Sequence, residues 1–282
     1  MKQLKTPLRY PGGKSRAVKK LFGFYPWKRS DGRQPMYKEF REPFLGGGSV
    51  ALEITKRYPH IEVWVNDLYE PLYNFWCELQ HSGHQLQGEI EGLKNVHCNQ
   101  DSARCLFLEM KEVINDEEKS NFDRAIAFYI VNKCSFSGLT ESSSFSPQAS
   151  DSNFSMRGIE KLRFYEQVIE RWSITHLSYL HMMPNSKDTF TYLDPPYEIK
   201  PKLYGKSGSM HKGFDHDEFA HTCNTCVGDQ MVSYNSSSLI KDRFHSWQAY
   251  EYDHTYTMRS VGDYMKDQQQ RKELVLTNYG IR

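Results

Sequence analysis

Residues 194–197, Asp-Pro-Pro-Tyr, combine side chains that could activate an amine. The exocyclic amine of a nucleobase is a weak nucleophile, because its lone pair is delocalised into the ring. A carboxylate and a carbonyl that accept both N–H protons draw the nitrogen toward tetrahedral geometry and stabilise the positive charge that develops on it. Asp194 can supply one acceptor and the carbonyl of Pro195 the other. Pro196 further restricts the backbone, and Tyr197 offers a ring on which a base can stack. The alternative interpretation is a proline turn that ends a buried strand.

Residues 42–49, EPFLGGGS, are typical of a strand, a glycine turn and the start of a helix. Gly46 and Gly48 allow positive φ and close approach of a ligand, and a helix N-terminus attracts negative charge. Asp67 follows 19 residues after Gly48, at the end of the next predicted strand. An acid at this place binds ribose hydroxyls in Rossmann-like folds. The missing third glycine argues against NAD, so the pattern indicates another nucleoside-containing cofactor.

Residues 8–16, LRYPGGKSR, resemble part of a phosphate-binding loop. The pattern G-x-x-x-x-G-K-[ST] ends correctly at Lys14 and Ser15, but position 8 holds leucine where the first glycine is required. A nucleotide triphosphatase is therefore an alternative that fails at one of its two anchoring glycines.

Cysteine and histidine do not form a complete metal site in the sequence. His221, Cys223 and Cys226 stand close together, but no second pair follows at useful spacing, whereas zinc needs four ligands in a structural site. We therefore predict no metal. The six cysteines are scattered, which favours reduced thiols.

Charge and hydropathy limit the class of protein and its partners. No run of about 18 apolar residues is present, and the polar, basic beginning does not resemble a secretory signal, so we expect an intracellular protein without a membrane partner. The net charge is +1, yet residues 1–41 carry twelve Lys and Arg against two acids. Such a local excess favours a polyanionic partner over a solvated basic segment only slightly.

Strands and helices are expected to alternate at both ends of the chain. Strand patterns occupy residues 37–44, 61–67, 189–193, 230–235, 247–253 and 271–279, and helical patterns follow the first two of them. This order predicts an α/β fold with a mostly parallel, doubly wound sheet. Residues 80–160 are expected to form a mainly helical insertion, in which residues 135–157 are rich in Ser and Asn and lack helical periodicity.

The motifs together, and their order, resemble the D12-class adenine-specific DNA methyltransferases, which include bacterial Dam and phage relatives. RYPGGKS, EPFLGGGSVAL, VND, NKCSFSGL and YLDPPY match the family in sequence order, and GFDHDEFA, MVSYN and KELVLTNY resemble its later segments. The resemblance implies a Rossmann-like S-adenosylmethionine-dependent methyltransferase sheet. It places the catalytic domain in residues 1–79 and 161–282 and an inserted target-recognition region in residues 80–160.

The resemblance also implies roles for particular residues. Residues expected to bind S-adenosyl-L-methionine are Tyr10, Lys14, Phe44, Gly46, Gly48, Asp67 and Asp194. Residues expected to act in catalysis are Asp194, Pro195, Pro196 and Tyr197. Residues expected to contact double-stranded DNA are Lys133, Ser137, Asn153, Ser155 and Arg157.

The expected activity is methylation of adenine N6 in DNA by a monomeric, cytoplasmic enzyme of a bacterium or a phage-infected cell. Methylation of cytosine N4 uses the same amine chemistry and stays an alternative, as does an inactive DNA-binding relative. Residues 135–157 are expected to form a hairpin that enters the major groove, with a mobile loop as the alternative. They contain no counterpart of the basic hairpin with which Dam reads GATC, so the sequence does not predict the target site.

Overall fold

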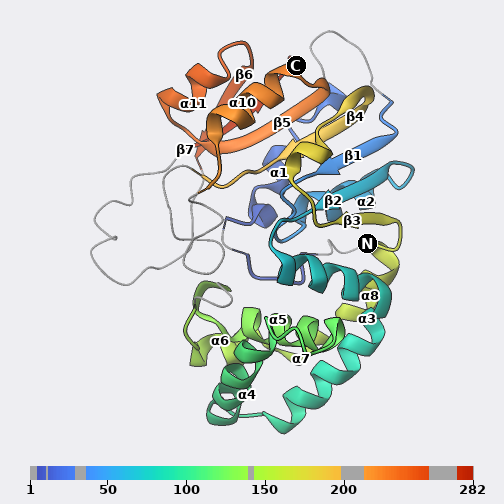
Figure 1. Ribbon diagram of the computed structural model, residues 1–282, viewed down its shortest axis with the longest axis vertical. Helices are drawn as coiled ribbons and strands as arrows, with labels where there is room; N and C mark the ends of the chain where they lie inside the picture. The colour runs from blue at the N-terminus through green and yellow to red at the C-terminus, as the bar shows by residue number, and fades with distance from the viewer. Residues whose placement is uncertain are drawn as a thin grey trace.

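The computed structural model describes residues 5–10, 12–28, 36–138, 143–197, 213–253 and 272–281. These residues form a seven-stranded sheet with the strand order β3-β2-β1-β4-β5-β7-β6 (Figure 1). The strands are β1 (Glu39–Glu42), β2 (Glu62–Asn66), β3 (Trp172–Thr175), β4 (Asn185–Leu193), β5 (Val227–Asn235), β6 (Gln248–Asp253) and β7 (Lys272–Thr277).

The sheet is parallel except at β7. Strand β1 pairs in parallel with β2 and β4, and the β2–β3 and β4–β5 pairs are also parallel. Strand β7 lies between β5 and β6 and is antiparallel to both. The predicted α/β fold with a mostly parallel, doubly wound sheet is therefore confirmed. Strand β3 was not predicted from the sequence, because this four-residue edge strand buries only Trp172 and so lacks a strand pattern.

Neighbouring strand residues face two different hydrophobic clusters. Met231 of β5 and Val275 of β7 pack in the larger cluster, whereas the next residues, Val232 and Leu276, pack in the smaller one. Side chains alternate between the two faces of a strand, so this division shows that both faces of the sheet are covered.

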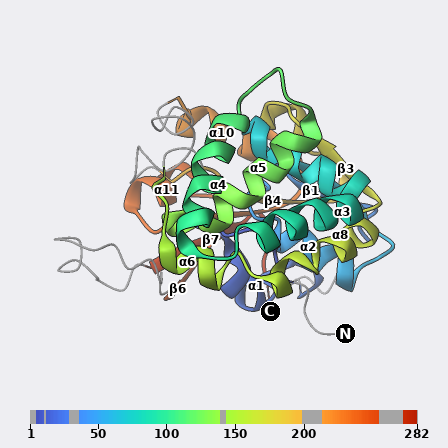
Figure 2. The same ribbon diagram turned by 90° about the horizontal axis from the view of Figure 1, so that it is seen from below.

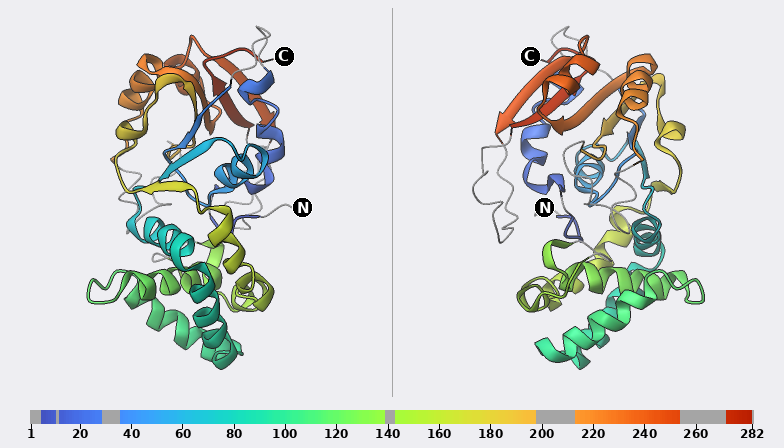
Figure 3. Two further views of the ribbon diagram at one scale, coloured as in Figure 1. Left: turned by 90° about the vertical axis from the view of Figure 1, so that its right-hand side faces the viewer. Right: turned by 60° about the vertical axis from the view of Figure 1, so that its left-hand side comes forward.

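The helices fall into two groups in space. Those associated with the sheet are η1 (Lys14–Arg16), α1 (Val18–Leu21), η2 (Pro26–Lys28), α2 (Ser49–Arg57), α8 (Leu162–Val168), η4 (Tyr179–Met182), α10 (His216–Thr225) and α11 (Ser238–Arg243). Those beyond it are α4 (Gln100–Val113), α5 (Asn121–Cys134), η3 (Phe136–Gly138), α6 (Pro147–Ser152) and α7 (Met156–Ile159). Figures 1 and 3 show this second group as a helical region below the sheet.

Helix α3 (Glu70–Val96) joins the two groups. It begins directly after β2, bends at Ser82, where φ is −138°, and continues into the helical region. Figure 2 shows the helical region from below, with α4 and α5 in front of the sheet. The predicted start of the insertion at residue 80 lies inside α3, close to this bend, so the chain crosses that boundary within one helix.

The Ser-rich stretch 135–157 is only partly irregular. An isolated bridge joins Ser135 to Phe145, residues 139–142 lie outside the described residues, and α6 and the start of α7 occupy the second half. Ser146 and Ser155 accept hydrogen bonds from the backbone N–H groups of residues 149 and 158, and so act as helix N-caps. The expectation of a non-helical hairpin is thus wrong for this half, because its serines cap two short helices.

A buried amide joins the helical region to the segment before η1. The side chain of Asn132, fully buried at the end of α5, accepts from Arg9 N at 2.9 Å and donates to Arg9 O at 2.7 Å and Gly138 O at 3.1 Å. Arg9 also donates to the carbonyl of Ser135 at 2.8 Å. We refer to these contacts as the Asn132 latch. It holds the residue that immediately precedes Tyr10.

We predict that Asn132→Ala lowers the free energy of unfolding by about 2–4 kcal/mol, because it leaves three backbone groups without their partner. The measurement is urea unfolding of the variant and the wild type. Asn153→Ala is the matched control, since the Asn153 amide donates only to Ser152 in an exposed contact, and its change should stay within about 1 kcal/mol. Equal stability of Asn132→Ala and the wild type would contradict a structural role for the latch.

Candidate active site

The centre of the site is the buried ammonium group of Lys14. Its side chain is 5% exposed, and Nζ lies 2.9 Å from Oδ1 of Asp194 at the end of β4. It also donates to the hydroxyl of Tyr197 at 2.8 Å and to the carbonyl of Gly12 at 3.2 Å. Two of the predicted motifs, RYPGGKS and LDPPY, therefore meet at Nζ of Lys14. The ammonium is held by carboxylate and hydroxyl groups.

Glu273 of β7 completes the group around Lys14. It is 2% exposed, its Oε2 accepts from the Tyr197 hydroxyl at 2.8 Å, and the same oxygen lies 3.9 Å from Lys14 Nζ. Glu273 lies in the segment KELVLTNY and was not among the predicted site residues. An acid beside the apolar run LVL of a buried strand is the signal that could have identified it, because ionised side chains are rarely buried without a partner.

The ring of Tyr197 is fixed from more than one side. It packs nearly parallel to the ring of Tyr234 on β5, with centroids 5.8 Å apart and 30° between planes. The Lys14 ammonium lies 5.0 Å from the centroid of the Tyr197 ring. Tyr234 in turn shares a 2.6 Å hydrogen bond with His216 at the start of α10. The LDPPY segment is thus held by β5, β7 and α10 as well as by Lys14.

Burial controls the ionisation of Asp194. It raises the pKa of this carboxyl group above its usual value, while the adjacent ammonium of Lys14 opposes the rise and Glu273 adds to it. A carboxylate with a raised pKa is a stronger hydrogen-bond acceptor and a stronger base than one in water.

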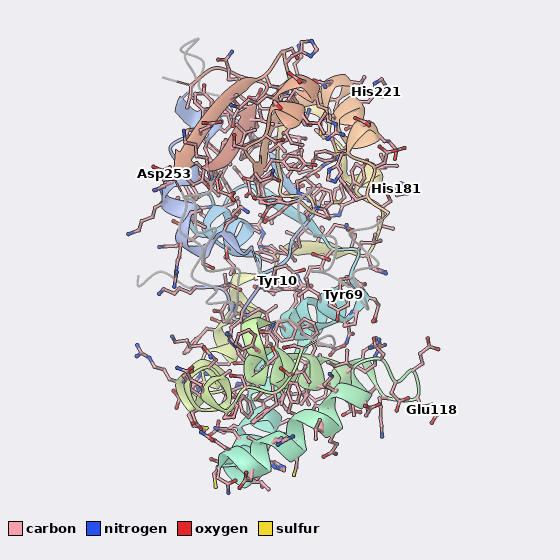
Figure 4. The ribbon with its side chains drawn as sticks, turned by 90° about the vertical axis from the view of Figure 1, so that its left-hand side faces the viewer. Tyr10, Tyr69, Glu118, His181, His221 and Asp253 are labelled. Atoms are coloured by element: carbon pink, nitrogen blue, oxygen red, sulfur yellow. The ribbon has the colours of Figure 1, made fainter. Side chains whose placement is uncertain are left out.

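The glycine turn after β1 is shaped around an aromatic ring. Gly46 has φ of +50° and Gly48 of +65°, which side chains rarely adopt. A Cβ on Gly46 would lie 2.9 Å from the ring of Tyr10, and one on Gly48 would lie 2.8 Å from the ring of Trp76. Figure 4 shows Tyr10 at the level where the sheet and the helical region meet. The glycines are therefore required both by the backbone and by the packing of Tyr10 and Trp76.

Asp67 lies at the end of β2 and binds two backbone N–H groups. Oδ2 accepts from Gly46 at 2.8 Å, and Oδ1 accepts from Tyr69 at 3.0 Å. Burial raises the pKa of Asp67 from 3.8 to about 6, against the lowering effect of these hydrogen bonds and of His176. The carboxylate joins the glycine turn to the start of α3. The carboxyl ends of β1, β2 and β4 thus bring the glycine turn, Asp67 and Asp194 to the same edge of the sheet, at the switch point of the strand order.

Two further residues near the turn have structural partners. Glu42 is buried at the end of β1 and accepts from Ala51 N at 2.8 Å, and burial raises its pKa well above the usual range. Glu42 was not among the predicted site residues. Phe44, which we expected to bind the cofactor, packs against the rings of Tyr179 and Phe214 with centroids 5.6 and 5.8 Å away.

The residues expected to contact DNA lie in the helical region, away from the LDPPY segment. Lys133 is only 9% exposed, because α5 is enclosed and all its residues from 125 to 134 are buried. The contact between Lys133 and DNA stays a prediction. Ser137 lies in η3, Asn153 is the C-cap of α6 and Ser155 the N-cap of α7. Arg157 on α7 is exposed.

The described residues hold neither a metal cluster nor a membrane span. That part of the chain contains no group of three or more His, Cys, Asp or Glu side chains arranged to hold a metal ion. Cys223 is buried, and burial raises the pKa of its thiol well above the usual value. None of the described helices is both long and apolar enough to cross a membrane.

Comparisons with known proteins identify a family and several relatives. The family model of the D12 class N6 adenine-specific DNA methyltransferases matches residues 10–258. The type II methyltransferase M1.LlaDCHI of Lactococcus lactis is 23% identical over 260 residues, which cover 86% of this chain and 87% of the relative. A DNA adenine methylase of Vibrio cholerae is 25% identical over 225 residues, covering 78% of this chain and 75% of the relative.

Among solved structures, the rRNA methyltransferase aviRa of Streptomyces viridochromogenes is similar with a TM-score of 0.38 and 10% identity. The match covers 95% of this chain and 86% of that one.

We predict that Asp67→Asn changes how stability depends on pH. Folded wild-type protein keeps the Asp67 proton up to a pKa of about 6, whereas the unfolded chain releases it near 3.8. Between these values the folded state binds more protons, so the contribution of Asp67 to stability falls as pH rises, by about 3 kcal/mol in all. The amide that replaces the carboxyl group does not titrate. The free energy of unfolding of the variant therefore lacks the decrease with rising pH that Asp67 causes in the wild type.

The measurement is the free energy of unfolding of both proteins at several pH values from about 4 to 7. The stability of the variant relative to the wild type should rise up to about pH 6 and then stay level. If the amide loses one of the hydrogen bonds from Gly46 or Tyr69, the free energy of unfolding of the variant changes by the same amount at every pH. The dependence of that free energy on pH is then unchanged. Parallel curves would show that burial does not raise the pKa of Asp67.

Proposed function

The chain belongs to the D12 class N6 adenine-specific DNA methyltransferases, and from this premise we propose that the site around Lys14 and Asp194 transfers a methyl group from S-adenosyl-L-methionine to adenine N6. The observation that carries the proposal is the convergence of the glycine turn, Asp67 and the LDPPY segment at one edge of the sheet. In this arrangement a nucleoside-containing cofactor and an amine would lie next to each other.

The residues at this edge fit the proposed cofactor chemically. Asp67 uses one lone pair of each oxygen for the N–H groups of Gly46 and Tyr69, and a carboxylate oxygen can accept a second hydrogen bond, here from the ribose hydroxyls. Gly46 and Gly48 keep the turn free of side chains that would separate the ligand from the backbone. When bound, S-adenosyl-L-methionine supplies a methyl group on a positively charged sulfur, which keeps the electrons of the broken bond.

Asp194 and the backbone of Pro195 would bind the target amine. Accepting both N–H protons raises electron density on the nitrogen and stabilises the charge that it gains with the methyl group. Burial raises the pKa of Asp194, which also suits it to take the proton that the methylated amine must lose. Tyr197 would contribute its ring to the base, in a position already fixed by the hydroxyl contacts with Lys14 and Glu273.

The same contacts argue against a nucleotide triphosphatase. A phosphate-binding lysine must present its ammonium to phosphate oxygens, whereas that of Lys14 lies between Asp194 and the hydroxyl of Tyr197. Leu8, at the position of the missing glycine, is buried.

For the arrangement of the whole protein, we propose a catalytic domain of residues 1–79 and 161–282 and a target-recognition region of residues 80–160. The helical region below the sheet supports this division. Double-stranded DNA would be the substrate, which the family relationship supports. We propose that a monomer in the cytoplasm binds it.

Incubation with tritiated S-adenosyl-L-methionine and duplexes of varied sequence tests the proposal. Digestion to nucleosides should place the label in N6-methyladenine, and sequencing of the labelled duplexes should give the target site. Label in N4-methylcytosine would correct the base, and no incorporation into any duplex would refute the proposed activity.

We predict that Asp194→Ala lowers turnover at saturating cofactor by about 10²–10³, because a transition-state hydrogen bond is lost. Asp188→Ala is the matched control, since Asp188 lies in the first half of β4 and forms an exposed ion pair with Lys38. Turnover of this control should match the wild type. Unchanged turnover of Asp194→Ala would exclude Asp194 from the chemical step.

We predict that Arg157→Ala weakens binding to the preferred duplex by about 1–3 kcal/mol and leaves binding to a scrambled duplex nearly unchanged, because a guanidinium that reads a base edge acts only on its own site. The measurement is titration of both duplexes at several salt concentrations. Arg104→Ala is the control, since Arg104 is exposed on α4, and it should change neither affinity. Equal weakening on both duplexes, with a salt slope smaller by about one, would instead identify a phosphate contact.

A further inference from the structure

Lys133, near the end of α5, is a buried cation without an acidic partner. It is only 9% exposed, and the described residues give its Nζ neither a hydrogen bond nor an ion pair. The contact that they do give it is with the ring of Tyr129, whose centroid lies 5.2 Å away. Transfer of an ionised group from water into a protein interior costs free energy unless a partner compensates it, and one ring face replaces only part of the lost hydration.

Two further cations lie near this ammonium group. Burial lowers the pKa of Lys133 from 10.5 to about 8, and the charges of Arg9, before η1, and Lys161, before α8, add to this effect. The Arg9 guanidinium donates to the carbonyl of Ser135 at 2.8 Å, which is a neutral partner. We refer to Arg9, Lys133 and Lys161 as the cationic cluster. In the part of the chain that the structure describes, none of these three side chains forms an ion pair with an acid.

The fold alone does not require a charge at Lys133. Every residue of α5 from 125 to 134 is buried, and an apolar side chain of similar length, such as methionine, would pack on the Tyr129 ring without the cost of desolvation. The positive charge therefore points to an anionic ligand. Such a ligand can reach the ammonium group, because Nζ of Lys133 is not one of the completely enclosed atoms that lack a partner among the described residues.

The cationic cluster lies where the helical region meets the edge of the sheet that carries the glycine turn. The Asn132 latch holds the backbone of Arg9 against the residue that precedes Lys133. Arg9 is followed by Tyr10, whose ring packs against the glycine turn, at the level shown in Figure 4. Lys161 is exposed, so the cluster extends from this junction to the protein surface.

We propose that the cationic cluster binds a phosphate of the DNA backbone beside the target nucleotide. The inference rests on the proposed function, because that function brings DNA to this edge of the sheet. A guanidinium group presents its N–H groups in a planar fork that matches two phosphate oxygens, and ammonium groups add compact positive charge. Successive phosphates along a strand suit three cations better than the single carboxylate of S-adenosyl-L-methionine, which is the competing anion. The contact would fix the position of the duplex and would not read its sequence.

The test is titration of the whole chain with two duplexes of unrelated sequence at several salt concentrations. Lys133→Met should weaken binding to both duplexes by about tenfold, because one charge-assisted contact is lost. The slope of the logarithm of affinity against the logarithm of salt concentration should become smaller by about one. Lys133→Arg keeps a positive charge and should keep most of the affinity and of the slope.

A second readout uses the titration of Lys133 itself. Bound phosphate favours the charged ammonium, so binding takes up a proton where the free protein has lost it, above the pKa of about 8. From about pH 7 to about pH 9.5, the affinity of the wild type should therefore fall by about tenfold more than that of Lys133→Arg. The neighbouring Arg9 and Lys161 are present in both proteins, and burial raises the pKa values of Tyr129 and Cys134 above this range.

Stability separates this role from a structural one. The folded protein binds the Lys133 proton less strongly than the unfolded chain does, so the charge costs stability at pH values below about 8. At about pH 7, Lys133→Met should therefore unfold at a urea concentration at least as high as the wild type does. A lysine needed only for the fold would give a variant that unfolds at a lower concentration.

Lys111→Met is the matched control for DNA binding. Lys111 on α4 also lies over an aromatic ring, that of Phe107 at 5.8 Å, but its ammonium donates to the carbonyl of Ser143 at 3.1 Å. The affinities and the salt slope of this control should match those of the wild type. If Lys133→Met does not fold, the comparison of pH dependence between the wild type and Lys133→Arg still tests the inference.

An unchanged affinity and salt slope in Lys133→Met, or equal pH dependence in the wild type and Lys133→Arg, would overturn the inference while the proposed function stands. Calorimetry without DNA tests the other anions. A lower affinity of Lys133→Met for S-adenosyl-L-methionine would assign the cluster to the cofactor carboxylate, and loss of binding to inorganic phosphate alone would assign it to a free anion. Wild-type protein that binds neither duplex would refute the proposed function, and the inference with it.

Discussion

The structure of this site depends on one buried ammonium group. Lys14 is almost completely removed from water, and an isolated charge in such a place would lose far more hydration energy than packing returns. Its environment must therefore supply oxygen atoms, and these come from the nearby Gly12 and from two segments distant in the chain, the end of β4 and the start of β7. The need to solvate one cation thus fixes the relative positions of the loop before η1, the LDPPY segment and the antiparallel strand of the sheet.

Ionisable groups at the strand ends are held at a cost to stability. Burial raises the pKa values of Glu42, Asp67 and Asp194, so each is less favourably ionised here than in water. Glu42 offsets part of this cost by binding the backbone of α2, and Asp67 by binding that of the glycine turn and α3. Groups with displaced pKa values tend to gather where a protein performs chemistry, and the clustering at a single edge of the sheet follows that tendency.

Much of this edge could be predicted from the sequence, because its motifs are local. A glycine turn before an amphipathic helix, an acid 19 residues later and an Asp-Pro-Pro-Tyr segment after a strand each carry their own signal, and parallel strands bring their carboxyl ends together. Contacts between distant residues carried no such signal. Asn132 binds the backbone of Arg9, which no side-chain pattern reveals, and Glu273 acquires its role only because β7 inserts beside β5. The serines at 146 and 155 suggested a loop, since the same residue type favours both turns and helix caps.

The position of β7 has a consequence for how the molecule assembles. Strand β6 pairs with β7, and β7 with β5, in the described sheet, so β6 has no partner there until the later strand has entered between them. The contacts of Lys14 with Glu273 also join residues that lie near opposite ends of the chain. Contacts of such long sequence separation form late, after the loop entropy between them has been overcome. During synthesis on a ribosome, the pairing of β6 and the contact between Lys14 and Glu273 would therefore both wait for β7.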